Sequence, residues 1–80
     1  MNLVLYGKKS CSLCEKAEVM LNNLGLNYSL VDIEGDKSLW EEYRLLIPVL
    51  YLENSKQELL YPFDEYQISK FVKKNSNLLF

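Results

Sequence analysis

Residues 6–14 read Tyr-Gly-Lys-Lys-Ser-Cys-Ser-Leu-Cys, a CxxC motif preceded by two lysines. It holds both cysteines of the chain, Cys11 and Cys14. Closing so small a loop with a disulfide stabilises a fold by only about 2 kcal/mol on the chain-entropy model. The chain has no histidine, so two cysteines alone cannot supply the four N or S ligands of a structural zinc site. Thiol chemistry explains the pair better than a structural role does.

The residues on either side of the cysteines indicate a strand followed by a helix. Residues 2–6 form a short apolar run of the kind found in a strand buried inside a sheet. The segment 7–10 interrupts this run. Beyond it, apolar residues recur at helical spacing and share one face: Leu13, Ala17, Met20, Leu21 and Leu24. Gly25 suits the position just after the last turn of this helix.

Two residues are candidates for the N-cap of this helix. If Cys11 is the N-cap, the backbone N–H of Cys14 points back toward the sulfur of Cys11. A thiolate there lies at the positive end of the helix dipole, where a cysteine pKa falls from about 8.5 into roughly the 3.5–7.5 range. Ser12 is the alternative, because Ser12 and Glu15 also fit a capping box. The sequence leaves both open and favours Cys11.

With Cys11 at the cap, the two cysteines take different roles. Cys11 is the expected nucleophile. Cys14 lies one turn further on, on the apolar side of the helix, so it should be less exposed and suits a resolving thiol. Lys8 and Lys9 add positive charge beside the pair. We therefore predict a redox-active dithiol at the start of the first helix.

The rest of the chain predicts five more elements. The first two are a second strand over 26–33 and a short helix that is capped by Asp36 and ends at Ile47-Pro48. Two strands follow, over 49–52 and 57–61, and a turn over 53–56 joins them. The fifth element is a last helix that begins with a capping box over 64–67. Trp40 and Tyr43 should pack beneath the short helix. Phe63 and Ile68 have the spacing of a hydrophobic staple around the last cap.

The order β-α-β-α-β-β-α constrains the architecture. A crossover helix joins the first two strands, so they should be parallel with a right-handed connection. The last two strands form a hairpin and are therefore antiparallel. We predict an α/β fold in which three helices pack on one four-stranded mixed sheet. The first helix begins at the carboxyl end of a central strand, where open α/β sheets place their chemistry.

Length, composition and charge limit the classes of function. The 80 residues form a single expected domain over 1–80, and 49% hydrophobic with 25% charged residues is typical of a folded chain. A net charge of −2 argues against a nucleic-acid partner. No apolar run approaches the ~20 residues of a membrane span, and the first run is too short for a secretory signal. We expect a cytoplasmic monomer whose apolar tail, Leu78-Leu79-Phe80, docks on the domain or frays.

Residues 6–14, followed by a helix and then by Ile47-Pro48-Val49, resemble glutaredoxin. The chain is more closely similar to short glutaredoxin-like proteins, in which acidic residues follow the CxxC motif and the last helix starts at a Phe-Asp pair. Here the acidic residues are Glu15 and Glu18, and the pair is Phe63-Asp64. The resemblance covers nearly the whole chain and implies a thioredoxin-like fold.

The resemblance also implies four substrate-binding residues. The proline that corresponds to Pro48 is cis and faces the dithiol in such folds, and the residue before it, Ile47, offers its backbone to a peptide or glutathione. Lys8 matches a lysine that commonly contacts a glutathione carboxylate. Asp64 begins the last helix, whose N-terminus can face a carboxylate. Many glutaredoxins have a Gly-Gly pair just before this point, which the present chain lacks.

The expected function is thiol–disulfide exchange. Cys11 attacks a disulfide-bearing or glutathionylated protein, Cys14 resolves the mixed disulfide, and glutathione or another thiol donor restores the dithiol. This cycle needs no bound metal or organic cofactor. One alternative is a carrier in which Cys11 of two copies and two glutathiones hold a [2Fe–2S] cluster. The other is a binding module of the same fold with little turnover.

Overall fold

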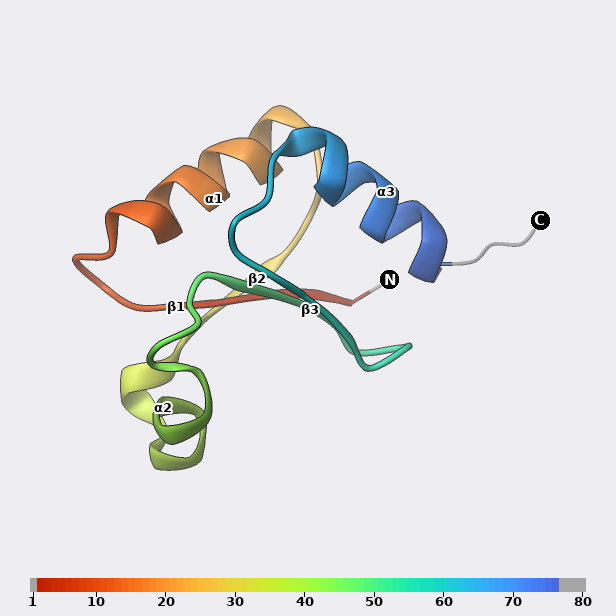
Figure 1. The fold of residues 1–80 in the computed structure, drawn as a ribbon. Helices are drawn as coiled ribbons and strands as arrows, with labels where there is room; N and C mark the ends of the chain where they lie inside the picture. The colour runs from red at the N-terminus through yellow and green to blue at the C-terminus, as the bar shows by residue number, and fades with distance from the viewer. Residues whose placement is uncertain (1, 77–80) are drawn as a thin grey trace.

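The computed structural model describes residues 2–76, so the tail Leu78-Leu79-Phe80 lies outside the described residues. The elements follow the predicted order (Figure 1): β1 (Leu3–Gly7), α1 (Ser12–Asn23), β2 (Ser29–Asp32), the short 3₁₀ helix η1 (Ile33–Gly35), α2 (Lys37–Tyr43), β3 (Val49–Leu52), β4 (Gln57–Leu60) and α3 (Glu65–Ser76). None of the helices within residues 2–76 has the length and apolar character needed to span a bilayer.

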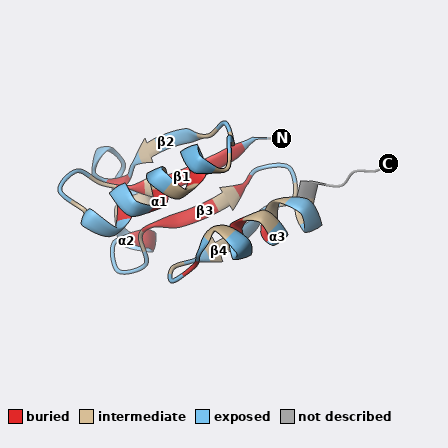
Figure 2. Cartoon of the chain, turned by 90° about the horizontal axis from the view of Figure 1, so that it is seen from above, coloured by how far each residue is buried: buried red, intermediate tan, exposed pale blue. Residues whose placement is uncertain are grey.

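The four strands form one mixed sheet in the order β2-β1-β3-β4. β1 pairs with β2 in parallel and with β3 antiparallel, and β3 and β4 form the antiparallel hairpin. The predicted α/β architecture is therefore confirmed. The central strands β1 and β3 are mostly buried, whereas the edge strands β2 and β4 are mostly exposed (Figure 2).

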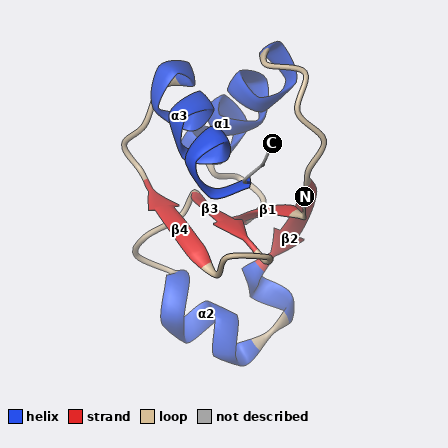
Figure 3. Ribbon diagram, turned by 90° about the vertical axis from the view of Figure 1, so that its right-hand side faces the viewer, coloured by secondary structure: helices blue, strands red, loops and turns tan. Residues whose placement is uncertain are grey.

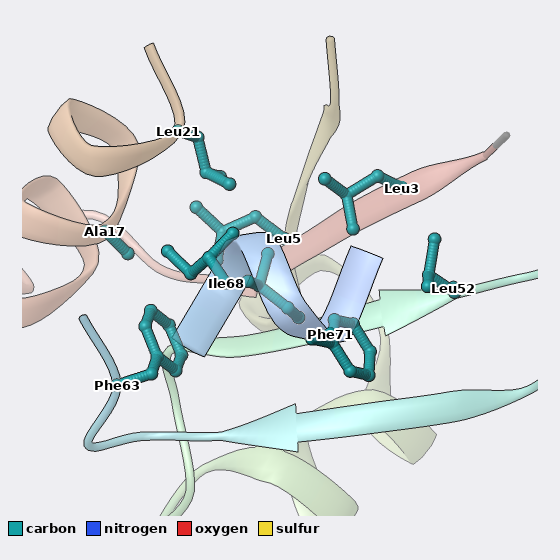
Figure 4. Close-up of a cluster of buried hydrophobic side chains, with 9 residues drawn as sticks. Leu3, Leu5, Ala17, Leu21, Leu52, Phe63, Ile68 and Phe71 are labelled. Carbon is teal, nitrogen blue, oxygen red and sulfur yellow. The ribbon is translucent and has the colours of Figure 1, made fainter. Parts of the chain in front are cut away.

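The helices cover the two faces of the sheet unequally. α1 and α3 lie on one face and α2 lies alone on the other (Figure 3). Alternate residues of a strand point to opposite faces. The main core therefore combines alternate residues of β1 and β3 with residues of α1, of α3 and of the segment before α3 (Figure 4): Leu3, Leu5, Ala17, Leu21, Leu50, Leu52, Phe63, Ile68 and Phe71.

The other face has a smaller cluster beneath α2. Ile33, Tyr43 and Val49 are buried there, and Trp40 packs against them, which confirms the expected packing of Trp40 and Tyr43. The ring of Tyr6 stacks on that of Tyr43 with centroids 4.6 Å apart. This cluster anchors α2 and the segment that leads into β3.

Several predicted strand boundaries were wrong. β1 spans Leu3–Gly7 and not residues 2–6. β2 begins at Ser29 and not at residue 26, because Leu26 and Tyr28 pack against the main core from outside the sheet. It ends at Asp32, whose carboxylate accepts the backbone N–H of Glu34 at 2.8 Å and thereby caps η1. The last strand ends at Leu60, one residue early, and a cis peptide bond follows between Tyr61 and Pro62.

The capping box predicted for the last helix is confirmed. The backbone N–H of Asp64 donates to the side chain of Gln67 at 3.0 Å, and the backbone N–H of Gln67 donates to the carboxylate of Asp64 at 2.9 Å. Phe63 and Ile68 are both buried in the main core, as the staple requires. These contacts fix where α3 begins.

Candidate dithiol site

Cys11 is the N-cap of α1. Its backbone is extended, with φ −112° and ψ 103°, and its sulfur accepts the backbone N–H of Cys14 at 3.1 Å. The carbonyl of Cys11 accepts the first helical hydrogen bond, from the N–H of Glu15. The N-cap is therefore Cys11 and not Ser12, which is the first residue of the helix. A thiolate of Cys11 gains both an amide donor and the positive end of the helix dipole.

The two sulfurs differ in accessibility. Cys11 and Cys14 are joined by a disulfide, with their Cα atoms 5.2 Å apart. Cys11 is half-buried, whereas Cys14 is only 3% exposed. An incoming molecule therefore reaches Cys11 first, as the sequence predicts for the nucleophile.

Gly7 allows the end of β1 to approach Cys14 closely. A Cβ atom at Gly7 would lie 3.1 Å from the sulfur of Cys14 and 3.3 Å from its Cβ. Few side-chain contacts are this tight, so any larger residue here would push against the buried half of the dithiol. The sequence showed Gly7 only as the first residue of the segment that interrupts an apolar run, because the contact depends on how α1 folds back over the strand.

Pro48, the residue just before β3, lies next to the same end of β1. The peptide bond between Ile47 and Pro48 is cis, which confirms that expectation. Because Tyr6 pairs with Val49 in antiparallel register, Pro48 comes next to Gly7. Pro48 is buried, and Ile47 packs against the cluster beneath α2. Sheet pairing thus places Ile47-Pro48 at the end of the sheet that carries the dithiol.

Lys8 follows Gly7 and extends toward α2. Its ammonium lies 5.6 Å from the centroid of the Trp40 ring, within the range of a cation–π interaction. Lys8 also lines a cavity that reaches Cys14. The structure therefore keeps Lys8 at the dithiol end of the molecule.

Asp64 is not brought to the dithiol. Its carboxylate accepts the N–H of Gln67, and the carboxylate of the next residue, Glu65, accepts the side-chain N–H of Asn23 at 3.0 Å. Asn23 is the last residue of α1, a 12-residue helix about 18 Å long. α3 therefore starts beside the end of α1 that is remote from Cys11 (Figure 1).

A cavity of about 300 Å³ opens beside the buried cysteine, between the start of α1 and the edge strand β2. Gly7, Cys14 and Leu30 contribute to its lining, together with charged residues of both signs: Lys8, Lys9, Glu15, Glu18 and Asp32. This cavity could not be predicted from the sequence. It exists because the parallel pairing of β1 with β2 sets Asp32 beside Gly7. The two residues are far apart in sequence, so the sequence does not show that they are neighbours.

Two of the similar solved structures share nearly a third of their residues with this chain. The X-ray structure of protein XcR50 from X. campestris is 31% identical with a TM-score of 0.81, and the match covers 88% of this chain and 93% of that one. The solution structure of protein Ne2328 from Nitrosomonas europaea is 31% identical with a TM-score of 0.74, covering 88% of each chain. No protein with a curated description matches the sequence.

A more distant structure shows the fold alone. Thioredoxin 1 from Thermosipho africanus is 12% identical with a TM-score of 0.57, over 96% of this chain and all of that one. The fold is thus thioredoxin-like, as expected. The sequence profile of the glutaredoxin-like domain (DUF836) matches residues 2–73, which includes both cysteines and the Ile47-Pro48 segment. The chain therefore belongs to the glutaredoxin-like domain family.

Proposed function

We propose that this protein is a thiol–disulfide oxidoreductase in which Cys11 is the nucleophile and Cys14 the resolving thiol. The observation that carries the proposal is the unequal environment of the two sulfurs. The sulfur of Cys11 caps α1 and accepts an amide N–H at 3.1 Å, while Cys14 is buried behind it. The helix cap favours a thiolate at Cys11. The burial of Cys14 suits a thiol that reacts only with Cys11 of the same molecule.

The cycle begins from the reduced dithiol. The Cys11 thiolate attacks a disulfide of a protein or of a glutathionylated thiol, and one half of the substrate leaves as a thiol. Cys14 then attacks Cys11, releases the second half and forms the Cys11–Cys14 disulfide. Glutathione is the thiol donor that we propose for restoring the dithiol, and we place the cycle in the cytoplasm, where thiols are kept reduced.

Three residues near the dithiol are proposed to bind the substrate. Ile47 and Pro48 are at the same sheet end as Gly7 and are suited to orient a substrate backbone. The ammonium of Lys8 offers a contact for a carboxylate. Asp64 is left out of this set, because it lies beside the remote end of α1.

The test is glutathione-coupled reduction of a small mixed disulfide by the wild type, Cys11→Ser and Cys14→Ser. We expect turnover to be lost in Cys11→Ser. Cys14→Ser should retain turnover of a glutathione mixed disulfide, because glutathione itself can release the product from Cys11. Full activity in Cys11→Ser would contradict the proposal, as would an inactive wild type.

A further inference from the structure

The acidic residues that follow the dithiol have no role in the cycle described so far. Glu18 is four residues after Cys14, so the two side chains lie on the same side of α1 with Cβ atoms about 5–6 Å apart. Both line the cavity of about 300 Å³ beside β2. The cavity thus connects a carboxylate to the buried cysteine.

Glu18 is held in place by Tyr28. The hydroxyl of Tyr28 donates to Oε1 of Glu18 at 2.8 Å. Burial raises the pKa of the Tyr28 hydroxyl, and the hydrogen bond to Glu18 raises that pKa further, so Tyr28 remains a donor at neutral pH. A carboxylate offers about four acceptor sites, so Glu18 keeps the capacity to accept another proton or hydrogen bond.

The other charged groups around the cavity are placed differently. Glu15 is next to Cys14 in sequence, which puts it about 100° around the helix and in an exposed position. The carboxylate of Asp32 caps η1. The ammonium of Lys8 lies over Trp40, and Lys9 is exposed. Among these groups, Glu18 combines a half-buried position with the same helix side as Cys14.

Resolution requires Cys14 to lose its proton, because the thiolate and not the thiol is the nucleophile. Only 3% of Cys14 is exposed, so bulk water has little direct access to this proton. A cavity of about 300 Å³ has room for several waters at about 30 Å³ each. These waters can link the thiol to a carboxylate on the next turn of the helix.

We propose that Glu18 accepts the proton of Cys14 during resolution and that Tyr28 is a positioning residue for Glu18. This inference rests on the proposed thiol–disulfide cycle. The proton passes from the Cys14 sulfur to Glu18 through cavity water. The Cys14 thiolate attacks the Cys11 sulfur, which forms the Cys11–Cys14 bond and breaks the bond from Cys11 to the substrate sulfur. The substrate leaves as a thiolate and takes a proton from solvent, and Glu18 returns its own proton to solvent. The dithiol loses two electrons and the substrate disulfide gains them.

The experiment separates the two thiol steps in a single turnover. The reduced protein is mixed with one equivalent of 5,5′-dithiobis(2-nitrobenzoate), and the release of the coloured thiolate is followed over time. Attack by Cys11 gives the first release and resolution by Cys14 gives the second. We expect Glu18→Gln to leave the first release unchanged and to slow the second by about tenfold or more at neutral pH.

Three variants test the assignment within the same cavity. Glu15→Gln makes the same change of charge next to Cys14 and should leave the second release at the wild-type rate. Glu18→Asp keeps a carboxylate and should recover part of the rate. Tyr28→Phe should slow the second release less than Glu18→Gln does, because it removes only the donor that holds Glu18. Thermal melting of each variant checks that it is folded.

The thiol pKa of Cys14, measured in the Cys11→Ser background, distinguishes proton transfer from a simple charge effect. Removing a nearby negative charge lowers a thiol pKa. A charge effect alone therefore predicts a lower Cys14 pKa and a faster second release in Glu18→Gln. Proton acceptance predicts a lower pKa together with a slower second release.

The outcomes separate this inference from the proposed function. A second release that is unchanged or faster in Glu18→Gln, or equally slow in Glu15→Gln, would overturn the role of Glu18 and leave the dithiol cycle intact. A wild type that gives the first release without the second would overturn both this inference and resolution by Cys14. A wild type that gives no release at all would contradict the proposed nucleophile.

Discussion

The two faces of the sheet are built from different kinds of side chain. The face beneath α1 and α3 holds a large cluster made of aliphatic residues and phenylalanine. The face beneath α2 holds a smaller cluster in which Tyr6 stacks on Tyr43, and the hydroxyl of Tyr43 donates to Glu58 on the edge strand β4. We infer that the cluster on the first face supplies most of the free energy of unfolding. The cluster on the second face holds α2, a helix with many polar residues, beside the dithiol.

The dithiol lies at one end of the sheet, where residues that pack on both faces come close together. Cys14 belongs to α1 and contacts the position of Gly7, whereas Ile47 packs with the cluster beneath α2. The site takes its cysteines from the face beneath α1 and α3, and the segment that we propose to bind the substrate from the face beneath α2. Substitutions on the two faces and at the dithiol test this division.

The largest effect is expected from Leu5→Ala in the main core. Leu5 is fully buried on the central strand, so truncation should lower the free energy of unfolding by about 2–5 kcal/mol. Leu39→Ala is the matched change beneath α2, where Leu39 is only half-buried, and should cost less. Urea denaturation of both variants measures the difference. Equal losses would show that the two faces contribute equally.

Gly7→Ala should perturb both stability and chemistry. The added methyl group would press on the Cys14 sulfur, and overpacking of this kind costs about 1–3 kcal/mol of unfolding free energy. We also expect a slower reaction of Cys14 in the single-turnover experiment. Gly35→Ala is the control, since nothing lies within 4 Å of its added Cβ. A Gly7→Ala protein indistinguishable from the Gly35→Ala protein would contradict the close contact.

Asp64→Ala should lower stability by about 1 kcal/mol, because it removes the N-cap of α3. Asp64→Asn retains a capping side chain and should lose less. Neither variant should change KM for oxidised glutathione, since α3 begins beside the remote end of α1. A raised KM in both variants would return Asp64 to the substrate site that the sequence suggested.

A loss of similar size is expected at Tyr43. Tyr43→Phe removes one hydrogen bond to Glu58 and should cost about 1 kcal/mol at neutral pH. Burial raises the pKa of Tyr43 above its usual 10.0, and the hydrogen bond to Glu58 raises that pKa further. The stability due to neutral Tyr43 is therefore complete below pH 10.0, where the unfolded chain is still protonated, and is lost as pH rises toward the folded pKa. Denaturation at rising pH should show a smaller loss in Tyr43→Phe than in the wild type.

Local sequence was enough to predict the order of the strands and α-helices, and it favoured Cys11 over Ser12 as the cap of α1. Apolar spacing, Gly25 and the Asp64 capping box each act over a few residues, so they can be read directly from the chain. The parallel and antiparallel pairings followed from the order of elements, because a crossover helix and a hairpin each permit one direction. The unequal burial of Cys11 and Cys14 also followed, since helix periodicity fixes which of them faces inward.

Other features depended on contacts between residues far apart in sequence. Sheet register sets Pro48 and Asp32 beside Gly7, and the packing of α1 over β1 makes glycine necessary there. The start of α3 beside Asn23 decides that Asp64 is remote from the dithiol, although the sequence placed it in the site.

The order of the strands and α-helices, a cysteine pair at the start of α1 and the family of the chain all follow from the sequence alone, because propensity, capping and motif spacing are local properties. The tertiary structure decided the cavity shared by Cys14 and Glu18, the hydrogen bond from Tyr28 that holds Glu18, and the position of Lys8 over Trp40. These arrangements join separate elements through side-chain packing, and packing is settled only when the sheet and its helices are assembled.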